Sequence, residues 1–127
     1  MATEGPLFHD GGQCQATTNL AAYQFFAAVI STVDRLLTFG TVSTLGMYGV
    51  LQNAPTSGQA ADVGILGITK AAVGAGGWTP GMTLQMSTQA DFVAFSSGTK
   101  CGVSLVTASS GALGTMLIIQ SASTGVV

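Results

Sequence analysis

Short apolar runs separated by turn-forming residues are the feature that most constrains the fold of this chain. Aromatic and β-branched residues concentrate in the runs, while Gly, Pro, Asn and Asp gather between them. The runs are Tyr23 to Thr32, Arg35 to Thr41, Leu45 to Gln52, Ala61 to Val73, Met82 to Ser87, Phe92 to Phe95, Cys101 to Thr107 and Met116 to Gln120. Short strands with frequent turns are typical of a sandwich or a barrel. We therefore predict an all-β fold, a small β-sandwich or barrel-like domain.

The turns and glycines add local detail to this prediction. Val33-Asp34 separates the first two runs and makes a hairpin between them plausible. Gly64 and Gly67 lie inside a run and indicate a bulge or a close approach by another backbone. The glycine-rich segment 74–77 lacks the Lys and the following helix of a phosphate-binding loop, so we interpret it as a turn.

The first 20 residues differ from the rest of the chain. Turn formers dominate this segment, and Leu7 and Phe8 are isolated apolar residues within it. We predict an extended N-terminal arm over residues 1–20 and a β-rich domain over 21–127. Burying a side chain such as Leu7 or Phe8 is worth roughly 1.5–3 kcal/mol, which favours an arm docked on a surface over a frayed terminus.

The composition indicates that the chain belongs to a larger assembly. Only 6% of the residues are charged, while 47% are hydrophobic. A soluble monomer usually has roughly 25–35% charged residues on its surface. Several runs are also apolar on both faces, which would leave one face without a partner inside a small domain, and association would cover that face. The alternative is that Gly, Ala, Ser and Thr form a surface that is soluble alone.

Charge and hydropathy argue against membrane and nucleic-acid partners. The longest apolar stretches, Ala21 to Ile30 and Gly111 to Ile119, are about half of the roughly 20 residues that a spanning helix needs. The N-terminus has no basic region followed by an apolar one, so we expect synthesis in a cytoplasm. The cations Arg35, Lys70 and Lys100 are scattered, whereas binding to phosphate backbones draws on clusters.

Residues suited to catalysis are few, and we expect that this protein is not an enzyme. The single histidine, His9, lies beside Asp10 in the predicted arm, which is a poor place to fix a base. The acidic residues show no spacing that pairs carboxylates or holds a metal, and we predict no catalytic residue, cofactor or metal site. Cys14 and Cys101 lack a C-x-x-C spacing and are either a structural pair or two free thiols, with reduced thiols expected in a cytoplasm.

Two aromatic residues are candidates for contacts between subunits. Trp78 is the only tryptophan, and tryptophan is enriched among the residues that dominate binding energies. A tryptophan can equally cap the core of its own chain, and the sequence leaves both interpretations open. Tyr48 is the second candidate, because it lies in a run that is apolar on both faces.

An ordered series of motifs resembles the small head decoration, or cement, proteins of tailed bacteriophages. The motifs are Gly49-Val50-Leu51-Gln52-Asn53-Ala54-Pro55, then Gly58, Val63 to Lys70, the glycine-rich turn through Gly81, and the late strand Gly102 to Val106. Pro6-Leu7-Phe8 with Gly11-Gly12 is similar to the opening of the arm in that family. The resemblance covers about residues 6 to 120. The segment Tyr23 to Leu37 departs from it by being more aromatic and apolar.

The resemblance implies a structural virion protein on the outer surface of an icosahedral phage capsid. Proteins of this family bind as homotrimers at threefold and quasi-threefold positions and clamp adjacent subunits of the major capsid protein. Their arm typically adds to an edge strand of the coat protein, so the resemblance makes Pro6, Leu7 and Phe8 the candidate capsid-binding residues. Deletion of residues 1–20 is then expected to abolish capsid binding and to leave a folded domain.

A second class of structural protein fits the same composition. Low charge and apolar strands also suit a phage or pilus-like fibre or tube subunit that self-assembles by strand and apolar-face stacking. A carbohydrate-binding sandwich is a third possibility, but the aromatic residues amount to 7% and are mostly Phe in apolar runs, which provides few sugar platforms.

Overall fold

The computed structural model describes residues 2, 4–31, 33–40, 46–97 and 100–119, and within them the fold is all-β, as predicted. The strands are β1 (Leu7–His9), β2 (Cys14–Ala16), β3 (Ala27–Ile30), β4 (Leu36–Phe39), β5 (Gly49–Leu51), β6 (Ala60–Ala61), β7 (Val63–Ala72), β8 (Thr83–Met86), β9 (Phe92–Ala94), β10 (Lys100–Ser104) and β11 (Leu113–Ile118). In this part of the chain, no helix is long and apolar enough to cross a membrane.

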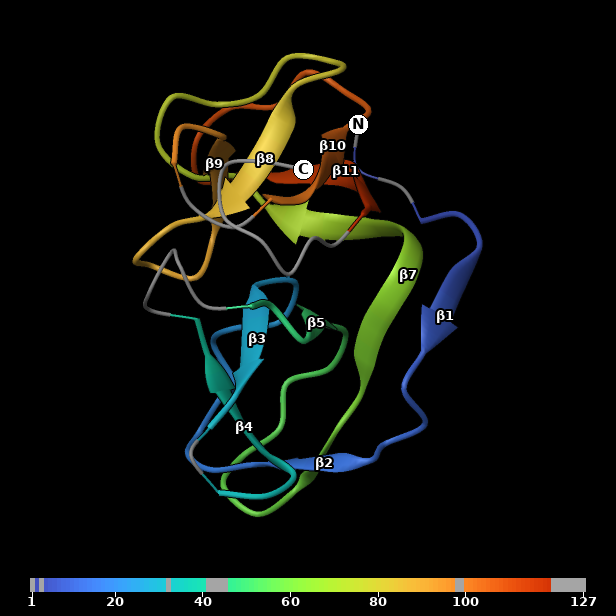
Figure 1. Cartoon of the computed structure of the whole chain (residues 1–127), viewed down its shortest axis with the longest axis vertical. Helices are drawn as coiled ribbons and strands as arrows, with labels where there is room; N and C mark the ends of the chain where they lie inside the picture. The colour runs from blue at the N-terminus through green and yellow to red at the C-terminus, as the bar shows by residue number, and fades with distance from the viewer. Residues whose placement is uncertain (1, 3, 32, 41–45, 98–99, 120–127) are drawn as a thin grey trace.

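One 11-stranded sheet contains all of these strands, in the order β6-β2-β4-β3-β5-β7-β11-β10-β8-β9, with β1 paired to β7 outside this path. Every pairing is antiparallel except that of β2 with β4, so the sheet is mixed. Strand β7 is the longest and bends sharply along its length (Figure 1). It therefore connects the β2–β5 part of the molecule with the β8–β11 part, and β1 lies along its outer side.

Each apolar run contains a strand, and the predicted hairpin is confirmed, because β3 pairs with β4 through Val29 and Thr38. The last strand begins at Leu113, earlier than expected from the sequence. Its second residue, Gly114, packs against the Trp78 ring, where a Cβ atom would lie 2.5 Å from Cζ3. Four ends of the predicted runs lie outside the described residues, namely Thr32, Thr41, Leu45 and Gln120.

The first 20 residues contain two strands of the same sheet. Strand β1 pairs with β7, and β2 lies between β4 and β6. Cys14, Ala16 and Leu20 are buried in the core. Part of the segment that the sequence suggested as an arm therefore belongs to the sheet and the core, and the division at residue 20 stays a prediction. Strands of three residues between glycine-rich turns carry little pattern, which is why the sequence did not reveal them.

Two clusters of buried side chains form the core. The first contains Ala27, Val29, Met47, Val50, Ala71, Val73, Trp78, Leu84, Met86, Phe92, Cys101, Met116 and Ile118. The second contains Cys14, Ala16, Leu20, Ala28, Leu37, Leu51, Ala61 and Val63. Because side chains alternate along a strand, Val50 enters the first cluster and the neighbouring Leu51 enters the second.

Strands β3 and β5 are therefore buried on both faces by their own chain. This finding corrects part of the reasoning from sequence, which took two apolar faces on a strand as a sign that one face needs another subunit. For β3 and β5 the second face is covered by the second cluster, to which β2 contributes Cys14 and Ala16. Most of the exposed apolar surface of the molecule therefore lies away from these two strands.

Candidate binding surface

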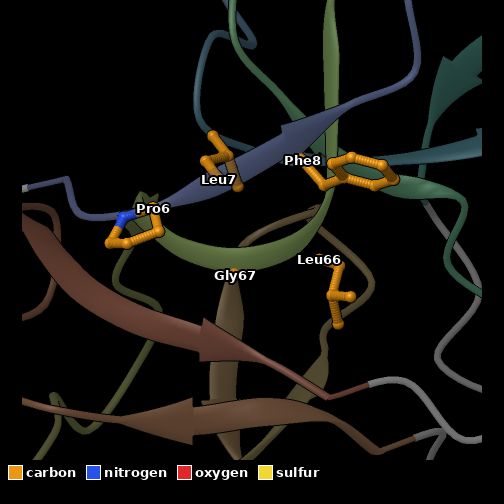
Figure 2. Close-up of a pocket in the computed structure, with 5 residues that line it drawn as sticks. All are labelled: Pro6, Leu7, Phe8, Leu66 and Gly67. Atoms are coloured by element: carbon orange, nitrogen blue, oxygen red, sulfur yellow. The ribbon is translucent and has the colours of Figure 1, made fainter.

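The exposed apolar surface that stands out is where β1 lies along β7. Phe8 and Leu66 face each other in the register of the two strands, and their side chains are 68% and 59% exposed. Together with Pro6, Leu7 and Gly67 they line an open depression of about 390 Å³ (Figure 2). We call these five residues the β1–β7 ridge. Exposed apolar side chains that gather at one place are typical of binding sites.

Backbone hydrogen bonds hold β1 against β7. Ile68 N donates to Pro6 O at 2.8 Å, Gly5 N donates to Ile68 O at 3.2 Å, and Asp10 N donates to Val63 O at 2.9 Å. The segment around Leu7 and Phe8 is thus docked on its own domain, and the docking fixes the direction of each side chain.

Gly67 makes this close approach possible. Its φ angle is +118°, and a Cβ atom there would lie 2.2 Å from Pro6 O. A Cβ atom at Gly64 would lie 2.9 Å from a methyl carbon of Leu7. The close backbone approach that the sequence allowed for is confirmed at Gly67, where the approaching backbone is the N-terminal segment itself, whereas at Gly64 the approaching atoms are those of side chains.

The predicted capsid-binding residues differ in what they present. Pro6 and Phe8 are exposed, whereas Leu7 is half-buried and packs against the first core cluster. This difference follows from the alternation of side chains along a strand. Leu7 anchors the ridge from beneath, and Phe8 forms its surface. Sequence reasoning missed Leu66, although an apolar residue between Gly64 and Gly67 in a strand is the kind of signal that could have revealed it.

Asp10 fixes the end of the ridge that follows β1. Its Oδ1 accepts hydrogen bonds from Gly12 N at 3.1 Å and from Val63 N at 3.2 Å, and its Oδ2 accepts one from the Tyr48 hydroxyl at 3.1 Å. Next to it, His9 Nδ1 lies 2.8 Å from Asp62 Oδ1, and both side chains are nearly half exposed. An exposed pair of this kind contributes little, about 0–1 kcal/mol. The geometry of these residues serves to position β1.

Tyr48, predicted as a subunit contact, uses its hydroxyl within its own chain. Burial raises the pKa of this phenol above its usual range, and hydrogen bonds with Cys14 and Asp10 raise it further. The group therefore stays protonated and donates to Asp10. Its part-exposed ring remains a candidate contact, which stays a prediction.

Trp78 lies in the core of its own chain. Only 2% of its surface is exposed, and its Nε1 donates to Phe92 O at 2.9 Å. A side chain with so little exposed surface has almost nothing left to offer a second subunit. Of the two interpretations that the sequence left open for Trp78, the structure favours the core.

Both cysteines are buried free thiols. Burial raises the pKa of Cys101 to about 12, partly offset by a hydrogen bond with the backbone of Met86. A thiol with so high a pKa is a poor nucleophile at neutral pH. Across the described ranges, no three or more His, Cys, Asp or Glu side chains gather in a way that could hold a metal ion.

Comparison with known proteins gives a likeness of fold but none of sequence. No family model matches the chain, and no curated protein matches its sequence. Among solved structures, the N base of the head fiber protein gp8.5 of bacteriophage phi29 superposes with a TM-score of 0.64 and 20% sequence identity. The superposition covers 94% of this chain and 96% of the other, so the two share their fold over nearly their whole length.

Proposed function

We propose that this protein is a structural component of a phage head, located on the outer surface of the capsid. In this role it binds as trimers at threefold and quasi-threefold positions and clamps adjacent subunits of the major capsid protein. The observation that carries the proposal is the likeness of fold, over nearly the full length of both chains, to a protein described as the base of a phage head fiber. The role is mechanical and needs no catalytic step.

The β1–β7 ridge is the proposed contact with the coat protein. Its exposed side chains, Phe8 above all, supply apolar surface. Among the strands that the structure describes, β1 pairs with β7 alone. The backbone groups of Pro6 and Asp10 form hydrogen bonds with β7. Along an antiparallel strand, successive residues direct their N–H and C=O groups to opposite edges, so those of Leu7 face the edge of β1 away from β7. A strand of the coat protein can add to that edge, with Phe8 and Leu66 beside it.

Such a contact suits a cement role in physical terms. Apolar packing and backbone hydrogen bonds are less sensitive to salt than exposed ion pairs. Each contact is small, but a protein that binds many sites on one shell stabilises the shell at all of them, and a trimer adds the effect of linked sites.

The test is co-sedimentation of the full chain with undecorated shells of the phage that encodes it. We expect saturable binding of the wild-type protein. Phe8→Ser should weaken binding at least about 10-fold, because it removes the main apolar contact. Leu113→Ser is the matched control, since Leu113 is also an exposed apolar residue, at 41%, but is not part of the ridge. Failure of the wild-type protein to pellet with shells would refute the proposal, and equal loss in both variants would exclude the ridge.

A second candidate function is the base of a head fibre or tube. It is favoured by the name of the structural neighbour, which is itself a fiber base. Electron microscopy of the concentrated protein distinguishes the two candidates. Discrete compact particles are expected for a decoration protein, and filaments for a fibre or tube subunit.

A further inference from the structure

The three cations of the chain are in different situations. Lys70 Nζ lies 5.7 Å from the centre of the Phe25 ring, and Lys100 Nζ lies 5.1 Å from that of Phe95, so each is attracted to an aromatic face of its own chain. Arg35 is exposed and, among the described residues, has neither an acidic partner nor an aromatic ring beneath it. Its guanidinium is available to another molecule.

The turn between β3 and β4 holds Arg35 in place. Its φ angle is 58°, in the left-handed region, and its carbonyl accepts a hydrogen bond from Gln15 N at 3.0 Å. Leu36 N donates to Val33 O across the same turn. Ile30 and Val33 are 43% and 56% exposed. We call Ile30, Val33 and Arg35 the hairpin tip. It presents the guanidinium of Arg35 beside apolar surface, and the exposed Asp34 precedes Arg35 in the same turn.

A polar pocket of about 200 Å³ offers complementary chemistry. It is lined by Ala75, Ser87, Thr88, Gln89, Asp91 and Val93, and we call it the Asp91 pocket. Asp91 Oδ1 accepts a hydrogen bond from the Ser87 hydroxyl. Gly74 packs against the carboxylate, since a Cβ atom there would lie 2.6 Å from Oδ1. Hydroxyl, amide and carboxylate oxygens thus surround a space that carries one negative charge.

The hairpin tip and the Asp91 pocket lie at opposite ends of the same hairpin. Ala27 N donates to Ala90 O at 2.7 Å, which places the pocket loop beside the start of β3. Strand β3, from Ala27 to Ile30, extends about 10 Å at 3.2–3.4 Å per residue. In Figure 1, β3 and β4 extend from there toward the end of the molecule opposite β8 and β9. The length of the hairpin therefore separates Arg35 from the pocket of its own chain.

We propose that Arg35 of one copy inserts into the Asp91 pocket of a second copy. A guanidinium presents several N–H donors and forms charge-assisted hydrogen bonds with a carboxylate, which suits this set of acceptors. The apolar part of the tip, Val33, then meets the apolar lining, Ala75 and Val93. The contact leaves the β1–β7 ridge free, so one copy can touch its neighbour and the coat protein at once.

The contact is heterologous, because the two surfaces differ. Such contacts close into a ring if the rotation between copies permits and otherwise continue as a filament. The inference rests on the proposed function in one respect only: the contact would join the copies of the proposed trimer, and the number three comes from that proposal.

Sedimentation velocity of the full chain over a range of concentrations tests the contact without any shell. We expect the wild-type protein to self-associate more strongly at low salt. Arg35→Gln should weaken association at least about 10-fold, because hydrogen bonds to charged groups are among the stronger ones. Gln89→Lys should do the same by placing a cation at the pocket. Gln89 is exposed and, unlike Asp91, has a side chain that holds no hydrogen bond within the described residues, so this variant should fold.

A charge exchange gives the decisive comparison. The double variant Arg35→Glu with Gln89→Lys should recover association that each single change loses, whereas Lys100→Gln, the control, should leave it unchanged. A wild-type protein that stays monomeric at all concentrations, or single variants that associate as the wild type does, would overturn the inference. Shell binding is measured separately. A protein that pellets with shells but never self-associates refutes this contact alone. A protein that self-associates but does not pellet with shells refutes the proposed function alone.

Discussion

Strands β5 and β1 are both three residues long and each contains two large apolar side chains, yet they occupy opposite environments. Every residue of β5 is buried, with Val50 and Leu51 entering different core clusters. In β1 only Leu7 packs inward, and Phe8 is 68% exposed. The difference comes from position in the sheet, since β5 lies between β3 and β7, while β1 has β7 alone as its neighbour among the described strands. An apolar strand therefore reveals a binding surface only when its place in the sheet is known.

The largest effect that tests this contrast is expected from shortening the N-terminus. Deletion of residues 1–20 removes β2 and the buried Leu20, whose truncation alone should cost about 2–5 kcal/mol. The total free energy of unfolding of a domain of this size is about 5–15 kcal/mol. We therefore expect the deletion to abolish the cooperative fold, contrary to the expectation from sequence.

Deletion of residues 1–9 is the matched comparison, because it removes the ridge strand and leaves Cys14, Ala16 and Leu20 in place. We expect this variant to keep a cooperative urea transition, followed by near-ultraviolet circular dichroism. A folded protein lacking residues 1–20 would show that β2 is dispensable and would contradict the role given to the second cluster.

Two leucines allow the contrast to be measured at single residues. Leu51 is 1% exposed and Leu66 is 59% exposed. Leu51→Ala should lower the free energy of unfolding by about 2–5 kcal/mol, whereas Leu66→Ala should change it by about 0.5 kcal/mol or less. Urea denaturation of both variants gives the comparison. Similar losses in the two would mean that Leu66 is covered and that the ridge is not exposed.

A somewhat smaller effect is expected where the ridge joins the domain. Gly67→Ala combines an unfavourable φ with a clash against Pro6 O and should destabilise the docked β1 by about 1–3 kcal/mol. Gly76→Ala is the control, because Gly76 also has a positive φ of +88° but open space around it. Hydrogen exchange of residues 5–9 should accelerate in the Gly67 variant alone. Equal exchange in both would show that β1 is not held by this close approach.

The smallest effect concerns pH and the buried thiol of Cys101. Because burial raises its pKa from 9.0 to about 12, the folded state keeps this proton while the unfolded state loses it. Stability should therefore be unaffected below pH 9 and fall as the pH rises toward 12, by about 1 kcal/mol between pH 9 and pH 10. Tyr48 also lowers the stability at still higher pH, and it does so in both proteins. The measurement is therefore the difference in urea midpoint between the wild type and Cys101→Ala as a function of pH. Parallel curves for the two proteins would contradict the burial of this thiol.

Much of the fold could be predicted from sequence, because runs of β-branched and aromatic residues between turn formers depend on local preference. Gly64 and Gly67 were also informative, since a glycine inside a strand has few other uses. What could not be predicted depends on distant partners. The three-residue strands β1 and β2 carry no pattern of their own, and the burial of Trp78 depends on Gly114 and Phe92.

The candidate surface was predictable only in part for the same reason. Phe8 drew attention as an apolar residue in a segment of turn formers, and Pro6 through the resemblance to the decoration proteins. The structure leaves both exposed. Leu66 belongs to the same surface only because the register places it opposite Phe8. Nothing in the sequence links Arg35 with the Asp91 pocket. The proposed contact between them rests on their places at opposite ends of the β3–β4 hairpin.

Hydrogen exchange of the protein free and bound to undecorated shells tests the central claim most directly, because it locates the contact without altering the chain. If the β1–β7 ridge binds the coat protein, the amides of residues 7–9 should exchange more slowly on the shell, while those of Leu51 and its neighbours in β5 stay as they are in the free protein. Binding to shells with no added protection along β1 would contradict the claim that this edge is the contact.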